Sequence, residues 1–160
     1  MNGVGVPEVS EFGSVDPAPP QVYRSLDEHR DEMLNEEQRM FLRMRAIFAL
    51  RNIGGVESVA ALCDGFASSS ALLRHEIAYV LGKMQNSSAL PRLVERLQDN
   101  SEHVMVRHEA AEAMGAIGEQ SIRPILEIYR FNQIIEVAES CEVALDLLDL
   151  CLESNCISDC

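Results

Sequence analysis

The chain has 160 residues, a formal net charge of −13, 47% hydrophobic residues and 5% aromatic residues. That length allows one domain with a real core, and the composition favours helices packed through alanine, leucine and valine. The acidic excess argues against nucleic acid as a partner, because phosphate contacts need clustered lysine and arginine. No apolar run approaches the ~18 residues that a membrane span requires, so no membrane partner is expected.

The beginning of the chain and its cysteines indicate a cytoplasmic protein. Residues Met1 to Ser10 lack the basic start and apolar stretch of a secretory signal. Five cysteines are an odd number, which favours reduced thiols. Three of them, Cys151, Cys156 and Cys160, lie near the end with a spacing that fits no common zinc pattern.

The composition divides the chain into three segments. Residues 1–20 contain three glycines and four prolines, which block regular helix, so they are expected to form a flexible lead-in or linker. Residues 21–153 show helical periodicity and form the predicted repeat domain. Residues 154–160 are the remaining cysteine-containing tail.

Apolar residues recur at helical spacing through the middle segment, and Gly, Asn and Ser clusters separate the stretches. The first stretch is weakly amphipathic and the second ends at Asn52–Gly55. The expected helices are Val22–Asn35, Gln38 to about Asn52, Val56–Phe66, Arg74–Met84, Ala89–Gln98, Arg107–Ile117, Ile122–Tyr129 and Val137–Leu152.

These helices repeat along the chain. The pairs Ala49-Leu50, Val80-Leu81, Ala113-Met114 and Ala144-Leu145 lie 31, 33 and 31 residues apart. Each unit is a helix pair of about 30 residues with small residues where neighbours touch, and one pair cannot bury its own apolar face. The sequence therefore predicts an all-α fold, an α-solenoid of about four helical-hairpin repeats.

Two His-Glu dyads, His75-Glu76 and His108-Glu109, occupy the same place in the two middle repeats. Each follows an arginine, and the two histidines are 33 residues apart (108 − 75). The outer repeats carry Met44-Arg45 and Glu139-Ser140 in that place. Equivalent residues on helices packed ~8–10 Å apart are close enough to share one metal ion.

The predicted metal site consists of His75, His108 and one carboxylate, with Glu109 preferred over Glu76. Neighbouring helical residues point about 100° apart, so His and Glu of one dyad do not point at the same spot. Two histidines and a carboxylate are the ligand set of non-haem iron oxygenases, and the same set also binds zinc.

Simpler interpretations exist for each residue. A histidine at a helix start is commonly a surface or capping residue, a glutamate there favours the helix dipole, and duplication of a repeat copies a motif without function. His29 and His103 lie outside the pattern and are expected to be solvated. The sequence contains no Gly-rich phosphate loop, no G-x-S-x-G elbow and no C-x-x-C pair.

Longer strings around the dyads resemble the deoxyhypusine hydroxylase family of tandem HEAT-type repeat proteins. The resemblance covers Ser14 to about Asp149. The strings that carry it are Ser14–Pro20, Arg45–Asn52, Leu73–Glu76, Met105–Ala110, Gly115–Ile117 and Glu139–Asp146.

The resemblance implies a monooxygenase that hydroxylates deoxyhypusine on translation initiation factor 5A with two irons and molecular oxygen. It implies a HEAT-like fold of two halves that face each other across the iron site. By motif match, His75, His108 and Glu109 are Fe(II) ligands. Glu76 matches the carboxylate of the first dyad, beside the iron or on the substrate amine, and is therefore both a metal-site and a catalytic candidate.

The chain departs from the family pattern in one respect: the family has four dyads and this chain has two. It therefore resembles the C-terminal half, supplies ligands for one iron, and is expected to need the missing N-terminal half or a second copy. The alternative function is a catalytically inactive HEAT-repeat scaffold that binds a basic protein partner through its acidic surface.

Overall fold

The computed structural model describes residues 18–22 and 24–158, with side chains described as far as Leu152. These residues form eight α-helices and no strand. The helices are α1 Leu26–Leu34, α2 Met40–Ile53, α3 Gly55–Asp64, α4 Ala71–Met84, α5 Leu90–Gln98, α6 Val104–Ile117, α7 Arg123–Tyr129 and α8 Ile135–Ser158. Short 3-10 helices occur at Gly65–Ala67, Ser87–Ala89 and Gln120–Ile122.

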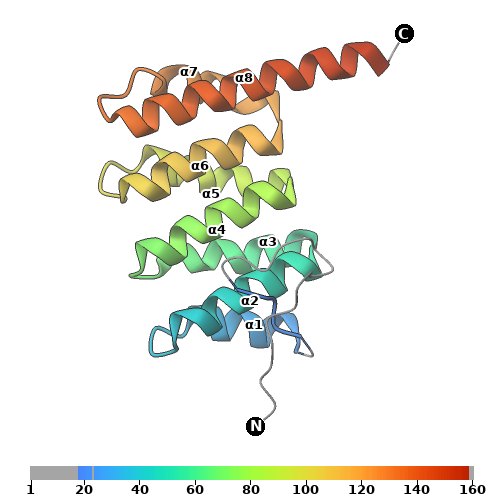
Figure 1. Ribbon diagram of the computed structural model, residues 1–160, viewed down its shortest axis with the longest axis vertical. Helices are drawn as coiled ribbons and strands as arrows, with labels where there is room; N and C mark the ends of the chain where they lie inside the picture. Colours follow the sequence, from blue (N-terminus) through green and yellow to red (C-terminus); the bar gives the residue numbers. More distant parts are fainter. Residues whose placement is uncertain (1–17, 23, 159–160) are drawn as a thin grey trace.

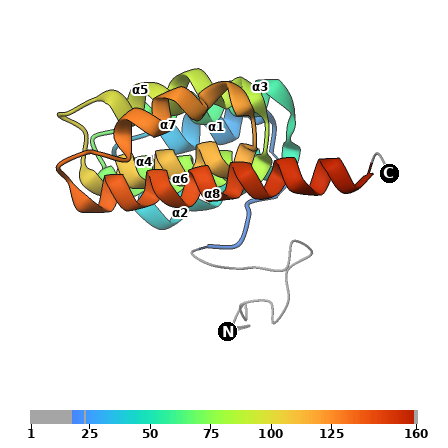
Figure 2. The same cartoon turned by 90° about the horizontal axis from the view of Figure 1, so that it is seen from above.

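The helices lie in two layers. Helices α2, α4, α6 and α8 stack one above another, and α1, α3, α5 and α7 form a second layer behind them (Figure 1). The view from above shows the same two layers edge-on (Figure 2). Alternate helices thus fall into alternate layers, which is the arrangement of stacked helical hairpins. The predicted all-α solenoid is confirmed.

Small residues bring the stacked helices of the front layer close together. A Cβ added to Gly82 of α4 would lie 2.8 Å from Ala113 Cα of α6. A Cβ added to Gly115 of α6 would lie 2.7 Å from Ala144 Cα of α8. These glycines and alanines are repeat equivalents, so the same close approach occurs at two successive junctions.

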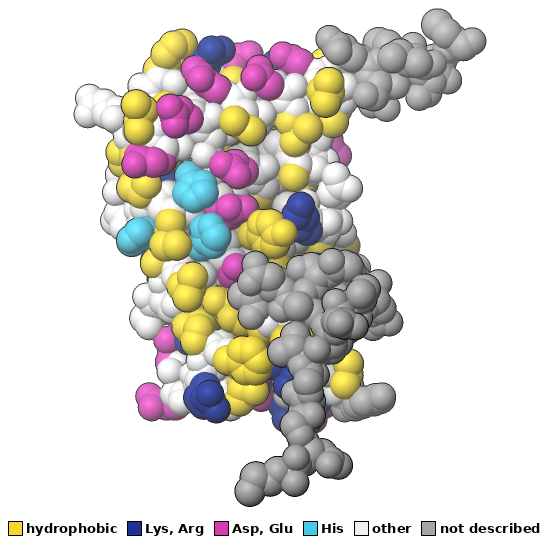
Figure 3. Space-filling model, in the orientation of Figure 1, with side chains coloured by type: hydrophobic (Ala, Val, Ile, Leu, Met, Phe, Trp, Pro, Cys, Tyr) yellow, Lys and Arg dark blue, Asp and Glu magenta, His cyan; other side chains and the backbone are white. Residues whose placement is uncertain are grey.

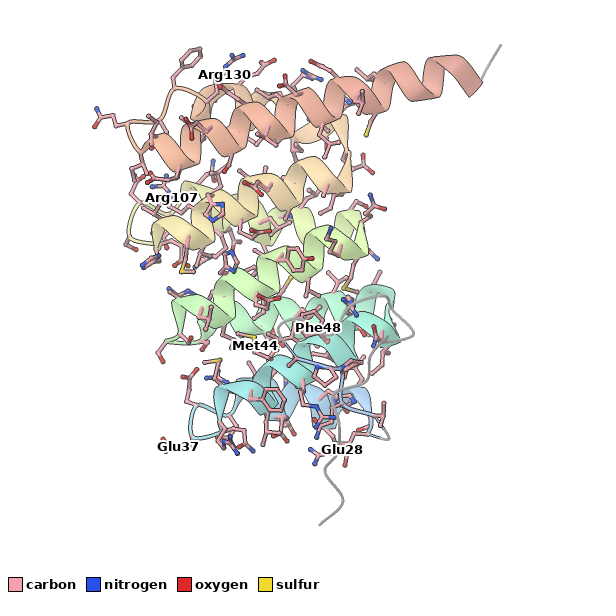
Figure 4. The ribbon with its side chains drawn as sticks, in the orientation of Figure 1. Glu28, Glu37, Met44, Phe48, Arg107 and Arg130 are labelled. Carbon is pink, nitrogen blue, oxygen red and sulfur yellow. The ribbon has the colours of Figure 1, made fainter. Side chains whose placement is uncertain are left out.

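The junction between α2 and α4 differs from the other two. Met44 and Phe48 of α2 are buried and lie where α2 meets α4 (Figure 4). Met44 occupies the place that His75 and His108 hold in the next two repeats. An apolar core residue in that place leaves no ligand at this junction.

The arginine that precedes each dyad position holds the repeats together. Arg43 is buried, and its Nε donates to Met33 O of the preceding helix at 2.8 Å. Arg107 is 1% exposed, and its Nε donates to Leu97 O at 3.0 Å. Both carbonyls belong to the last turn of a helix, where backbone acceptors lack partners within the helix. The arginine that precedes the dyad position is therefore structural in these two repeats.

Arg74 makes a different contact from its two equivalents. Its guanidinium pairs with Glu102 at 2.7 Å and donates from Nη1 to Ser68 O at 2.6 Å. Glu102 also accepts from Arg96 at 3.2 Å. The turn before α6 is therefore fixed by charged hydrogen bonds, immediately before the helix that carries His108.

The prediction that His29 is solvated is wrong. Its side chain lies in α1 and is 2% exposed, and its Nδ1 is buried without a hydrogen-bond partner among the described residues. Burial, followed by the nearby charge of Arg24, lowers the pKa of His29. Because α1 also buries Met33 four residues later, the histidine forms part of the apolar face of that helix.

The two end segments fall partly outside the described residues. The expected flexible lead-in covers residues 1–20, of which 1–17 are not described. At its end, Arg45 donates to Pro19 O at 3.1 Å and Gln21 N donates to Arg45 O at 3.2 Å, so residues 19–21 lie against α2. At the other end α8 runs to Ser158, past the expected helix end at Leu152, and Cys160 is not described. Within the described part of the chain, no helix has the length and apolar character of a membrane span.

Candidate metal centre

His75 and His108 occupy the same turn of two stacked helices. Each is the fifth residue of its helix, α4 or α6. The Ser70 side chain caps α4 by accepting from Leu73 N at 3.2 Å. His103 caps α6 through its own imidazole, with Nδ1 accepting from Met105 N at 3.2 Å. Matched caps start both helices at the same point of the repeat, and this sets the two imidazoles at the same height.

The two imidazoles and Glu109 converge. The ring centroids of His75 and His108 are 5.7 Å apart, with the planes tilted by 49°. His75 Nε2 lies 3.3 Å from Glu109 Oε2. One ligand atom from each of the three residues lies within 4.8 Å of the other two. The predicted cluster of two histidines and Glu109 is therefore present in the fold.

The spacing of these atoms fits a single metal ion. Two atoms each bonded at about 2.1 Å to one ion lie about 3–4 Å apart, depending on the angle between the bonds. The three ligand atoms lie up to 4.8 Å apart, about 1 Å more than such a site requires. Small rotations of these side chains, which are 11–28% exposed, can close that difference. The donor set of two nitrogens and one oxygen suits iron or zinc.

The electrostatics of the cluster favour positive charge. A hydrogen bond to Glu109 raises the pKa of His75 against the opposing effect of burial, and the charges of Glu109, Glu76 and Glu112 add to the increase. A site that stabilises a proton on His75 also stabilises a metal cation in the same place. Figure 3 shows histidine side chains gathered on one face of the molecule, with acidic side chains around them.

Glu76 does not join the cluster among the described residues. It lies on α4 next to His75 and is 8% exposed. Because α4 and α6 are related by the repeat, the rotation that turns Glu109 toward α4 turns Glu76 toward α2. The structure therefore brings together His75, His108 and Glu109, and Glu76 is not part of that group.

His103 lies outside the cluster as well. It is exposed, as the sequence indicated, and its role is to cap α6.

Two surface cavities adjoin the cluster. One, of about 310 Å³, lies between α6 and α8 and is lined by His108, Glu112, Glu136, Glu139, Ser140 and Val143. The other, of about 280 Å³, is bordered by Glu109, Glu112 and Lys83 and by less polar residues of α4, α6 and α8. Sequence reasoning missed Glu112 and Ser140, although the spacing of Glu112 four residues after His108 placed it on the same helical face.

Comparisons with known proteins agree with the fold. A family model described as HEAT repeats matches residues 59–145, and one described as PBS lyase HEAT-like repeat matches residues 42–68. The first match covers more than half of the chain. The chain belongs to the HEAT-repeat family.

The HEAT-repeat relatives are deoxyhypusine hydroxylases, which confirms the resemblance that the sequence strings indicated. The protein of Danio rerio is 53% identical over 138 residues, which are 86% of this chain and 45% of that protein. The protein of Homo sapiens is 45% identical over 145 residues, which are 91% of this chain and 48% of that protein.

A solved structure gives the same result. Human deoxyhypusine hydroxylase in complex with glycerol superposes with a TM-score of 0.86 at 45% identity, and the match covers 91% of this chain and 50% of that chain. The chain thus spans about half the length of the curated relatives it matches.

Proposed function

We propose that the chain is the metal-binding C-terminal half of an iron-dependent deoxyhypusine monooxygenase. In it, His75, His108 and Glu109 bind one Fe(II). The observation that carries this proposal is the convergence of two imidazoles and one carboxylate across the junction of α4 and α6. This ligand set leaves coordination positions open for oxygen or substrate.

His75 and Glu109 have different roles in the proposed metal site. Bound iron supplies the activation of molecular oxygen. His75 gives up the proton that its Nε2 shares with Glu109, because an imidazole nitrogen binds metal only when deprotonated. Glu109 then holds a cation in place of that proton, so metal affinity rises with pH through the raised pKa of His75.

The acidic surroundings suit a cationic substrate. The deoxyhypusine side chain is an amine, and the chain carries a net charge of −13. Glu76, which is not one of the three clustered residues, is assigned to the substrate amine rather than to the iron. The protein substrate is translation initiation factor 5A, and the reaction takes place in the cytoplasm.

Only one iron is held by this chain. The second iron of the family reaction requires a further set of dyads, from an N-terminal half or from a second copy facing the same surface. Since the chain spans about half of its relatives, hydroxylation by this chain alone is not part of the proposal.

Metal analysis tests the proposal. The chain is loaded with Fe(II) without oxygen, and bound iron is measured for the wild type and for His75→Ala, His108→Ala and Glu109→Ala. His103→Asn is the matched control, because it removes an exposed histidine near the cluster while keeping a side chain that can cap α6. The wild type and control should bind about one iron per chain and the other variants much less.

Glu76→Gln separates binding from turnover. It should retain iron and abolish hydroxylation of the deoxyhypusine protein, assayed by mass spectrometry once the second half is supplied. Equal iron in the wild type and all cluster variants would favour the scaffold function instead.

A further inference from the structure

Glu112 connects His108 to the last repeat. Its Oε1 lies 3.5 Å from His108 Nδ1, one helical turn away on α6. The same Oε1 accepts a hydrogen bond from Ser140 Oγ of α8 at 3.0 Å. Ser140 is 5% exposed and the Glu112 side chain is 44% exposed, so this bond lies at the partly buried edge of the junction between α6 and α8. An ordinary surface pair at this spacing would have no anchor on a second helix.

The close approach of α6 and α8 makes this contact possible. Gly115 lies against Ala144, one turn along from Ser140, and leaves no room for a side chain between the two helices. The Ser140 hydroxyl therefore reaches across the junction. The fourth repeat lacks a His-Glu dyad, but through Ser140 it acts on the dyad of the third repeat.

The two histidines differ in the partner of their Nδ1 atoms. At the position four residues after His75 stands Tyr79, where His108 has Glu112. His75 Nδ1 is buried with no hydrogen-bond partner among the described residues. His75 instead makes its contact through Nε2, to Glu109. A carboxylate is thus directed at the Nδ1 of one imidazole only.

We propose that Glu112, anchored by Ser140, is a positioning residue that holds the His108 ring with Nε2 toward His75 and Glu109. The inference rests on the proposed metal-binding function. Metal-ligating histidines characteristically donate their other ring N–H to a carboxylate, which fixes the orientation of the ring. A metal held at Nε2 would require the ring proton on Nδ1, and the Glu112 carboxylate, 3.5 Å from Nδ1, is placed to accept it.

One test uses the metal-free chain. Long-range ¹H–¹⁵N spectra at about pH 8, where an ordinary histidine is neutral, report which ring nitrogen carries the proton. His108 should carry it on Nδ1 in the wild type and in Ser140→Thr, which keeps the hydroxyl. In Glu112→Ala and Ser140→Ala that preference should weaken, while His75 keeps its wild-type signals.

A second test measures Co(II) affinity from its visible absorption. Glu112→Ala should weaken binding about 10- to 100-fold and Ser140→Ala about 3- to 10-fold, with Ser140→Thr close to wild type. Glu139→Gln is the control, since it removes a carboxylate from the same cavity without a contact to His108, and it should stay within about twofold.

The proposal is overturned if wild-type His108 carries its proton on Nε2, or if Glu112→Ala binds Co(II) as tightly as Glu139→Gln. A wild-type chain that binds no Co(II) would contradict the proposed function instead. The metal-free spectra then still decide whether Glu112 positions the ring.

Discussion

Replacing Gly115 by alanine tests whether the spacing of the front-layer helices depends on the absence of a side chain. The new Cβ would lie 2.7 Å from Ala144 Cα and 2.8 Å from Ala144 Cβ. Because the first of these atoms is backbone, α6 and α8 must move apart. Overpacking of this kind destabilises by about 1–3 kcal/mol, and the clash with backbone places this case in the upper part of that range. Alanine recovers up to about 1 kcal/mol through its better helix propensity.

The expected net loss is therefore about 1–2 kcal/mol, which lowers the melting temperature of a chain of this size by about 2–8 °C. Thermal and urea unfolding followed by circular dichroism measure it. The double variant Gly115→Ala/Ala144→Gly should recover only part of the loss, since the clash with the backbone of α8 remains. A Gly115→Ala chain that melts at or above the wild-type temperature would refute the close-approach argument.

Three further predictions concern charged groups. Hydrogen bonds with Ser68, Arg43 and Ser69, in that order, lower the pKa of Glu36 to about 2. The lowered pKa stabilises the folded chain above pH 4.5, and this stabilisation is lost as the pH falls toward about 2. Glu36→Gln should therefore flatten the acid side of the stability–pH curve, and an unchanged curve would contradict this. Burial lowers the pKa of His29, so the unfolded chain binds the proton first and the free energy of unfolding should fall as the pH drops below 6.5. His29→Gln should remove that fall in urea unfolding at about pH 5 to 7. A wild-type stability curve that is flat over this range would contradict the prediction. Arg107→Met should destabilise by about 1.5–3 kcal/mol, because it breaks a hydrogen bond from a charged guanidinium to the Leu97 carbonyl. Arg43→Met should destabilise more, because Arg43 makes the equivalent bond to Met33 O and also donates to the Glu36 carboxylate. The reverse order in urea unfolding would exclude this account.

The convergence of His75 and His108 could be predicted from the sequence because a repeat places matching positions next to each other. Once His75 and His108 share a place in successive units, packing distance alone brings their rings together. The preference for Glu109 over Glu76 followed from the rotation between adjacent residues on a helix. In the structure His75, His108 and Glu109 lie together, and Glu76 is not in that group.

His29 could have been placed correctly from its spacing. It lies three residues after Leu26 and four before Met33, so all three share one face of α1. The charged residues between them conceal this face and give the segment a weakly amphipathic pattern. Spacing was the better guide here than mean polarity.

Other features lay beyond sequence reasoning. Nothing in a single sequence marks Arg43 and Arg107 as structural, because the carbonyls of Met33 and Leu97 to which they donate are backbone groups without a residue signature. The hydrogen bond between Ser140 and Glu112 likewise depends on the distance between two helices, which the repeat pattern does not specify.

The cluster of His75, His108 and Glu109 is confined to one junction between consecutive units. Each unit of a solenoid touches only its neighbours, so units added or removed far from this junction leave it unchanged. The segment from α3 to α8 contains all three clustered side chains, both helix caps and the serine that reaches Glu112. Grafted into an unrelated helical array, this segment should therefore keep His75, His108 and Glu109 together.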